Sequence, residues 1–589
     1  MTRRVDLRNV ILCALVMAGA FLAVNPFVEM PFDDDWSYAF SVRQFLVSGH
    51  ITYNGWSAPL IITQTLWGAL WCKLLGYSFV TLRLSTLPMD IGAAMLCYVL
   101  ARRADLRPAA ALCVTLTLCL SPLFLPLALS FMTDVPAVFY ALMSLYLLLR
   151  AAHAASSRAA ILWLAAGTLA GIVGGMTRQI VWLAPLGVVP YLLIIRRENY
   201  AFLIAGILAW MIVLLDIVLC MQWFARQADV FLDPSLIACI RQGIARPRIT
   251  IINIILVTFT AVMFTLPAAL PFAADQLRRL WSERNSWRSA LAAIIILILS
   301  VEIARRPAFG MAPWLYNIVT AQGVIGPLEI SGDRPFIMPL LIRGVVSALV
   351  LMTTYLLAAR AVVLLIDFRK SAAKARNFFA AADARAFLVI FGVSYFVLLL
   401  IRAGQDLVFD RYCLPLIPCL GITLLRGRSL TLAWPMVVMF GIYGLASTQD
   451  NLALAAARRA GVERLESHGV PASQIAAGFE YDFDTQLQQA GRINRYGITN
   501  PTQPFNPIQG YTPALRCKYR LEFPLLPDTK ATPFGAVDYI SWLPPFHRRI
   551  YISEFTHPWW LGSSLPPGES VPMNFERDFE PVGATEERN

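Results

Sequence analysis

Long apolar runs alternate with short polar segments along most of this 589-residue chain. The first run, residues 9–28, is long enough to cross a bilayer as a helix. By apolar length we expect about thirteen spans, at approximately 9–29, 79–101, 109–127, 134–150, 160–176, 179–195, 201–222, 250–273, 289–304, 339–366, 386–402, 410–425 and 429–447. After residue 447 the pattern becomes polar, and the last ~140 residues hold no run of spanning length. The pattern predicts an all-α polytopic membrane region followed by a water-exposed domain.

Composition agrees with a membrane protein. The chain is 58% hydrophobic and 15% charged, whereas a soluble domain is about 45–50% apolar and about 25% charged. The net charge of +12 does not indicate nucleic-acid binding, because the basic residues gather in short loops between apolar runs. The ten cysteines show neither CxxC pairs nor Cys/His metal spacing.

Loop charges predict the orientation. If the N-terminus is cytoplasmic, every inner loop is basic, which is the pattern of the positive-inside rule. These loops are 102–107, 150–158, 196–197, 278–288, 369–385 and 426–428. Arg3, Arg4 and Arg8 precede the first run, which we expect to remain as an uncleaved anchor because it exceeds a typical signal core.

We therefore predict two domains, a transmembrane domain at 1–448 and an extracytoplasmic domain at 449–589. Within the first, the outer segment 31–78 carries acids and then tryptophans in an apolar stretch, which suggests helices lying on the membrane surface. In the second, 475–479 and 549–552 have the character of short strands. We expect a small α+β domain with a loose end after about Pro566.

Four polar motifs are predicted to meet the outer face. They contain Asp33-Asp34-Asp35 after the first span, Asp134 at the start of the fourth, Arg178 between the fifth and sixth, and Arg411 at the start of the twelfth. Charge at a membrane boundary is costly unless it is paired or used. Two acidic and two arginine sites at one level indicate a cavity for a ligand with an anionic head and a lipid tail.

Each motif also has an ordinary structural interpretation. The acidic trio would serve as a solvated helix cap, and Asp134 would be an N-cap with a proline in the first turn. Arg178 would reach to the interface, and Arg411 would be an interfacial anchor. Asp90 and Asp216 lie nearer mid-span, where the alternatives are that they line the cavity or that they form hydrogen bonds between helices, which we favour.

The order and sidedness of these motifs resemble the GT-C class of membrane glycosyltransferases, glycosyltransferase family 39-like. The similarity is to the bacterial relatives of protein O-mannosyltransferases and of the lipid A aminoarabinose transferase. It covers roughly residues 5–450, and residues 450–589 match nothing we identify. The motifs that carry it are Asp34-Asp35-Trp36-Ser37-Tyr38 after the first span, Gly76 with Arg83 before the second, Asp134, and Arg411-Tyr412-Cys413-Leu414-Pro415. Relatives often have Lys where Arg178 stands, and both residues supply a cation.

The resemblance implies an inverting enzyme that uses a polyprenyl-phosphate sugar. It implies Asp34 as the general base, with Asp35 and Asp134 positioning the acceptor or a divalent ion. Arg178 and Arg411 would hold the donor phosphate, with Arg83 a weaker candidate for that role. The metal stays open.

The implied partners are a polyprenyl-phosphate sugar donor, an envelope lipid, glycan or protein acceptor, and the lipid bilayer, with no nucleic acid. The implied location is the bacterial inner membrane. The alternative is a flippase or transporter of lipid-linked sugars, which predicts paired charges near the bilayer midplane and broken helices. A scaffold that only displays the C-terminal domain is a further alternative, and it would not require the acids.

Overall fold

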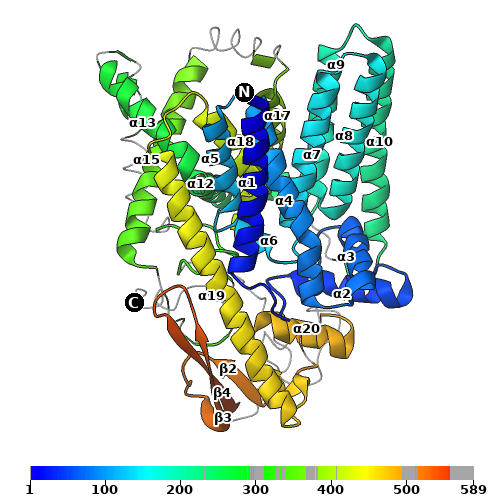
Figure 1. Ribbon diagram of the computed structural model, residues 1–589, viewed down its shortest axis with the longest axis vertical. Helices are drawn as coiled ribbons and strands as arrows, with labels where there is room; N and C mark the ends of the chain where they lie inside the picture. The colour runs from blue at the N-terminus through cyan, green and yellow to red at the C-terminus, as the bar shows by residue number, and fades with distance from the viewer. Residues whose placement is uncertain are drawn as a thin grey trace.

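The computed structural model is a helical bundle with a small sheet at one end (Figure 1). It describes residues 2–556 except 231–233, 297–310, 327–329, 367–377, 380–381, 406–407, 494–510 and the single positions 285, 288, 292, 295, 321, 333, 335, 337 and 513. The loose end expected after Pro566 lies outside this range.

Eight helices in the described part of the chain are long and apolar enough to cross a membrane. They are α1 (Thr2–Ala23), α4 (Phe79–Arg103), α7 (Asp134–Ala152), α8 (Ser157–Thr177), α10 (Tyr200–Ala225), α12 (Pro247–Phe264), α15 (Leu340–Ile366) and α17 (Ala384–Arg402). Shorter apolar segments complete the bundle: α5 (Pro108–Cys119), α6 (Phe124–Ala128), η1 (Gln179–Trp182), α9 (Leu183–Ile195), α11 (Leu236–Ala245) and α18 (Leu416–Leu425). The polytopic helical prediction is confirmed.

Two predicted spans are divided in the structure. The run at 109–127 becomes α5 and α6 with Pro122 in the break, where the missing backbone N–H and the ring of proline disfavour a continuous helix. The run at 250–273 becomes α12 and α13 (Leu266–Ser282), with Pro267 at the start of the second helix. The predicted span at 289–304 lies partly outside the described residues.

The segment predicted to lie on the membrane surface forms two helices, α2 (Asp35–Ser48) and α3 (Ile62–Leu75). Both lie at the same end of the bundle as the C-terminal sheet (Figure 1), and we call this the sheet end. The start of α4 is held there by Glu29, whose Oε1 and Oε2 accept the backbone N–H groups of Phe79 at 2.8 Å and Val80 at 3.2 Å. This contact places the Asp33–Asp35 segment close to α4.

The C-terminal region packs on α19 (Ala433–Ser467), whose second half extends beyond the bundle. It contains β1 (Ile475–Ala476), α20 (Phe479–Ala490), β2 (Tyr519–Glu522), β3 (Thr529–Ile540) and β4 (His547–Phe555). The strand order is β1-β2-β4-β3, with β1 parallel to β2 and the other pairs antiparallel. The α+β prediction is confirmed. Because α19 is one continuous helix, the predicted boundary at 448 falls inside it.

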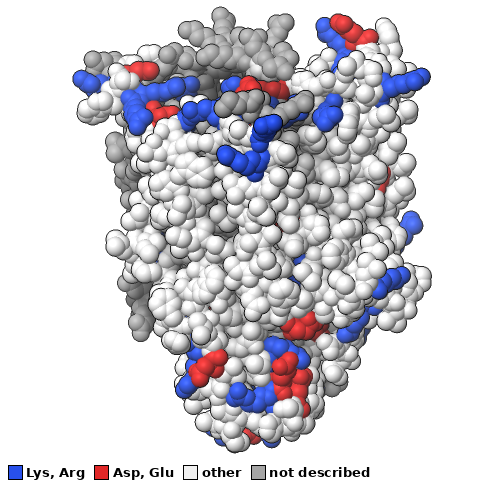
Figure 2. All heavy atoms as spheres, viewed as in Figure 1, with Lys and Arg blue, Asp and Glu red and all other residues white. Residues whose placement is uncertain are grey.

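On the face shown in Figure 2, charged side chains gather toward the two ends of the molecule and leave a wide belt with few charges between them. Exposed side chains such as Ile207, Leu208 and Met211 of α10 contribute to the apolar surface. Apolar exposure of this extent suits lipid rather than water as the surrounding medium. The chain is therefore a multi-pass membrane protein.

Candidate active site at the sheet end

The acidic trio sits where the loop after α1 enters α2. Asp33 has a left-handed backbone (φ 51°), which aspartate tolerates better than most residues. Asp35 begins α2, and Asp34 is the residue before it. Asp33 and Asp35 are almost fully buried. Three consecutive carboxyl groups thus point into different surroundings, and their partners decide what each can do.

Arg411 joins two of these acids. Its Nη1 contacts Oδ2 of Asp33, and its Nη2 donates to Oδ2 of Asp34 at 2.8 Å. The three side chains are 9%, 3% and 13% exposed. One buried guanidinium therefore faces two carboxylates, and ion pairs removed from water in this way are strongly affected by loss of a partner.

Arg178 and Asp134 form a second ion pair nearby. Nη1 of Arg178 lies 2.9 Å from Oδ2 of Asp134 and donates to Oγ1 of Thr133, also at 2.9 Å. The guanidinium carbon of Arg178 is 5.8 Å from the ring centroid of Tyr412, which follows Arg411 in the chain. The structure thus brings four predicted site residues into one cluster with Asp33: Asp34, Asp134, Arg178 and Arg411.

Close helix packing fixes the position of Arg178. A Cβ on Gly175, near the end of α8, would lie 2.0 Å from Nε1 of Trp182. The absent side chain lets the end of α8 turn directly into η1. Arg178 lies at that turn in an extended conformation, which directs the chain back toward α7 and Asp134.

Asp35 and Arg83 have different surroundings. The carboxylate of Asp35 accepts backbone N–H groups from Phe32 at 2.7 Å and Phe131 at 3.2 Å. Burial raises the pKa of Asp35 to about 7, although Arg83 and the two N–H donors lower it.

Arg83 donates to the carbonyl oxygens of Pro26, Val28 and Met30 at 2.5–2.9 Å. These contacts hold the loop that leads to the acidic trio. The predicted roles of Asp35 with the acceptor and of Arg83 with the donor remain predictions.

Two contributors were missed by sequence reasoning. Asp410 accepts backbone N–H groups from Ile318 at 3.1 Å, Val319 at 2.8 Å and Arg411 at 2.7 Å. It ties the segment before α15 to the 3-10 turn η3 (Asp410–Cys413). This places Asn317, whose Nδ2 donates to Oδ1 of Asp33 at 3.2 Å. Asp410 is the first residue of the predicted span at 410–425, but no local pattern indicated Asn317.

The charge of Asp33 depends on its surroundings. Burial raises the pKa of Asp33 well above its ordinary range, and the charge of Asp34 raises it further. Arg411 opposes both effects. Asp33 therefore takes up a proton more readily than an exposed aspartate does, so its charge depends on whether Arg411 stays in contact with it.

The two mid-span acids differ from each other. Asp216 accepts from Nε1 of Trp182 at 2.8 Å and from Sγ of Cys220 at 3.4 Å, so the predicted hydrogen bonding between helical segments is found there. For Asp90 the prediction is wrong, because neither carboxyl oxygen has a hydrogen-bond partner among the residues described.

The acids of this cluster do not resemble a metal centre. Across the described ranges, no group of three or more His, Cys, Asp or Glu residues is placed to hold an ion. Asp33, Asp34 and Asp134 each face an arginine instead. The chemistry considered below therefore includes no metal-dependent step.

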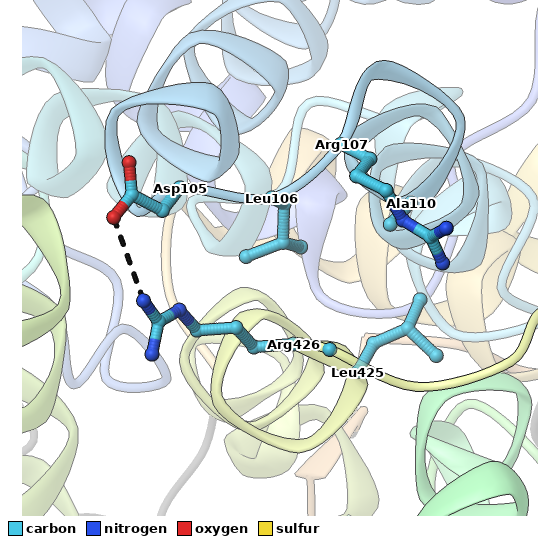
Figure 3. Close-up of a pocket in the computed structure, with 7 residues that line it drawn as sticks. Asp105, Leu106, Arg107, Ala110, Leu425 and Arg426 are labelled. Carbon is cyan, nitrogen blue, oxygen red and sulfur yellow. Dashed lines mark hydrogen bonds and ion pairs between the residues drawn. The ribbon is translucent and has the colours of Figure 1, made fainter.

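A separate hollow of about 270 Å³ lies at the opposite end of α4 (Figure 3). Asp105 and Arg426 form an ion pair across it at 3.4 Å, and Leu106, Ala110 and Leu425 also line it. Because it lies at the other end of the bundle, it does not belong to the acid and arginine cluster.

No family model matches the chain, and no curated protein does. Among solved structures, it is similar to the S. cerevisiae protein O-mannosyltransferase complex bound to the sugar donor. The sequence identity is 14%, the match covers 40% of this chain and 35% of that chain, and the TM-score is 0.32. It is also similar to the oligosaccharyltransferase AglB of Archaeoglobus fulgidus with an inhibitory peptide and a dolichol-phosphate, with 14% identity, coverage of 78% and 58%, and a TM-score of 0.40. A third is ArnT of Cupriavidus metallidurans bound to undecaprenyl phosphate, with 15% identity, coverage of 92% and 97%, and a TM-score of 0.35.

The chain thus spans 35% and 58% of the length of the first two chains. At these TM-scores the functional argument rests on the site itself.

Proposed function

We propose that this protein is a membrane glycosyltransferase that moves a sugar from a polyprenyl-phosphate donor to an acceptor at the outer face of the cytoplasmic membrane. The observation that carries the proposal is the buried cluster in which Arg411 and Arg178 face Asp33, Asp34 and Asp134 at one end of an apolar bundle. Two arginines beside carboxylates, at one end of a bundle with an apolar exterior, suit a lipid phosphate and a hydroxyl nucleophile.

Asp34 is the proposed general base. Its Oδ1 accepts from Nε1 of Trp56 at 2.7 Å and its Oδ2 accepts from Arg411. Each carboxylate oxygen has a second lone pair, so both can still accept another proton donor. A positioned carboxylate of this kind takes the proton from an acceptor hydroxyl as the new bond forms.

The transfer step balances as follows. The acceptor oxygen forms a bond to the anomeric carbon and gives its proton to Asp34. The bond from that carbon to the phosphate oxygen breaks, and its electron pair leaves with the lipid phosphate. Arg411 and Arg178 compensate the charge that develops on the phosphate, which is the usual role of fixed cations in such a step. Attack opposite the leaving group would invert the anomeric centre.

Asp134 is proposed to orient the acceptor and to keep Arg178 in place. Asp35 and Arg83 are given no step in this chemistry because both side chains are only 2% exposed and contact backbone groups of the surrounding loops. Asp33 is proposed to balance the charge of Arg411 when no donor is bound.

The test uses purified protein in liposomes with radiolabelled polyprenyl-phosphate sugars and an envelope extract from a deletion strain as acceptor. Transfer of label by the wild type and its loss in Asp34→Asn support the enzyme. Movement of donor between leaflets without transfer identifies a flippase instead. If the protein neither transfers label nor moves donor between leaflets, both functions are contradicted. Mass spectrometry of envelope glycans from the deletion strain would then identify what is lost.

A further inference from the structure

The proposed base is held by an indole from the loop between α2 and α3. Trp56 donates from Nε1 to Oδ1 of Asp34 at 2.7 Å, across 22 residues of sequence. Hydrogen bonds to an ionised carboxylate are stronger than neutral ones. With Arg411 on the other oxygen, this bond fixes the rotation of the Asp34 carboxylate.

Trp56 is itself surrounded by rings. We call Trp36, Trp56, Phe479, Phe483 and Tyr511 the aromatic cluster. The centroid of Trp56 lies 5.6 Å from Trp36, 5.8 Å from Phe479, 5.3 Å from Phe483 and 5.9 Å from Tyr511. These separations are typical of stabilising aromatic pairs. Three of the four neighbours come from the C-terminal region rather than from the bundle.

The C-terminal region also holds the loop that carries Trp56. The carbonyl oxygen of Asn54 accepts the backbone N–H of Ile493, just after α20, at 2.9 Å. The Asn54 side chain accepts from Oγ of Ser37 at 3.0 Å and donates to the Ser37 carbonyl at 2.9 Å. The loop is therefore fixed between α2 and the segment that follows α20.

α20 is in turn attached to the long helix α19. Arg458 of α19 pairs with Glu480 at 2.9 Å, and both side chains are at most 2% exposed. Its Nε also donates to the carbonyl oxygen of Ala477 at 2.7 Å. A continuous set of contacts thus runs from α19 through α20 to Trp56 and ends on Asp34.

We infer that Trp56 is a positioning residue for the base Asp34, and that α20 of the C-terminal region serves in transfer by holding Trp56 in place. This inference rests on the proposed glycosyltransferase function. It gives the C-terminal region a part in the reaction rather than a role in display alone.

The first test compares Trp56→Phe with Trp67→Phe. Trp67 is a matched control, because its Nε1 donates to the carbonyl oxygen of Ser85 at 2.7 Å and it is half-buried like Trp56, but its bond does not reach an acid. Loss of a hydrogen bond to a charged group predicts that Trp56→Phe lowers kcat by about 10- to 100-fold. KM for undecaprenyl-phosphate sugar should change less than threefold, and Trp67→Phe should change neither constant.

A double-mutant cycle tests the part played by α20. Phe483→Leu removes the closest ring of α20 while leaving the indole and its N–H in the protein. If Phe483 acts through Trp56, its substitution lowers kcat in the wild type and has little further effect in Trp56→Phe, because coupled residues are not additive. Thermal unfolding of each variant, measured beside kcat, keeps this comparison valid if one variant is less stable.

The outcomes separate the two proposals. If the wild type transfers sugar and Asp34→Asn does not, but Trp56→Phe behaves like Trp67→Phe, the positioning role is overturned and the function stands. If the effects of Phe483→Leu and Trp56→Phe add fully, the role of α20 is overturned. If the wild type transfers no sugar from any donor, the proposed function itself fails.

Discussion

Replacing Arg411 by glutamine tests the charge balance of the site. The substitution removes the cation that contacts Asp33 and Asp34 and leaves two buried carboxyl groups facing each other. Breaking a buried ion pair by removing one partner costs about 3–5 kcal/mol. As a check, two carboxylates ~5 Å apart repel by about 3 kcal/mol at an effective dielectric constant of ~20. We therefore expect a loss in unfolding free energy of about 3–5 kcal/mol.

The pH dependence of this loss has a definite sign. Burial, and then the charge of Asp34, raises the pKa of Asp33, and Arg411 no longer opposes this in the variant. The folded variant therefore binds a proton at Asp33 more tightly than the unfolded chain does, so its stability falls as pH rises above the ordinary aspartate range. The deficit of Arg411→Gln relative to the wild type should be smaller at pH 5 than at pH 8.

The buried cysteines allow thermal unfolding of the variants to be measured. All ten are free, nine are buried and Cys220 is half-buried, so a thiol-reactive dye reports thermal unfolding in detergent. Asp33→Asn in the Arg411→Gln background removes one of the two facing charges and should recover most of the stability. It should not recover donor binding, because the Arg411 guanidinium that is proposed to bind the donor phosphate is still absent.

Donor binding separates this interpretation from simple anchoring at the interface. Arg411→Gln should weaken binding of polyprenyl phosphate sharply, and Arg411→Lys should weaken it partly. Acceptor affinity should change little from the wild type in either variant. Equal stability of Arg411→Gln and the wild type at pH 8, or equal donor affinity in all three proteins, would refute the reasoning and leave Arg178 as the better phosphate ligand.

Three further predictions concern the base, a buried acid and the topology. Asp34→Asn should lower transfer by about 100- to 10,000-fold in folded protein, and Asp33→Asn much less; the reverse order in a transfer assay would reassign the base. Burial raises the pKa of Asp35 to about 7, so the stability that it contributes below its ordinary pKa is lost as pH rises through 7. Wild-type melting temperatures should thus fall from pH 5 to pH 8, and Asp35→Asn should show a weaker fall; an unchanged slope would contradict the shift. Reporter fusions after Arg103 and Arg197 should report cytoplasm, and a fusion after residue 467 the outer side, whereas a cytoplasmic signal at 467 would mean a miscounted span.

The helical fold could be predicted from apolar length because a helix is the simplest way for a spanning segment to pair its backbone groups. The breaks were harder to predict, since Pro122 and Pro267 lie within runs that remain apolar throughout. The extent of α19 was also missed. Its second half packs against the sheet, where Val462 and Leu465 belong to one buried cluster with Leu521 and Ile550. Such packing has no signature in local hydropathy.

Candidate residues could be predicted where charged side chains lie beside apolar spans. They could not be predicted where the evidence is a contact between uncharged groups far apart in the sequence. Carboxylates and arginines predicted at a membrane boundary are conspicuous in a sequence, so Asp34, Asp134, Arg178 and Arg411 could be singled out, and the structure places them in one cluster. Charge alone could not distinguish Asp35 from Asp34, and only the resemblance gave them different roles. The observed difference lies in the backbone N–H groups of Phe32 and Phe131 that bind Asp35. Asn317 was missed because its partner is 284 residues away.

Those long separations bear on how the site is assembled. Arg411 reaches Asp33 and Asp34 across 378 and 377 residues, so the cluster exists only when the first loop and η3 have come together. Until then each charge at the membrane boundary lacks its partner, and such groups are costly in that setting. Pairing therefore stabilises the assembled bundle as well as preparing the site. An incoming anionic phosphate then exchanges one partner of Arg411 for another and meets a cation that is already in place.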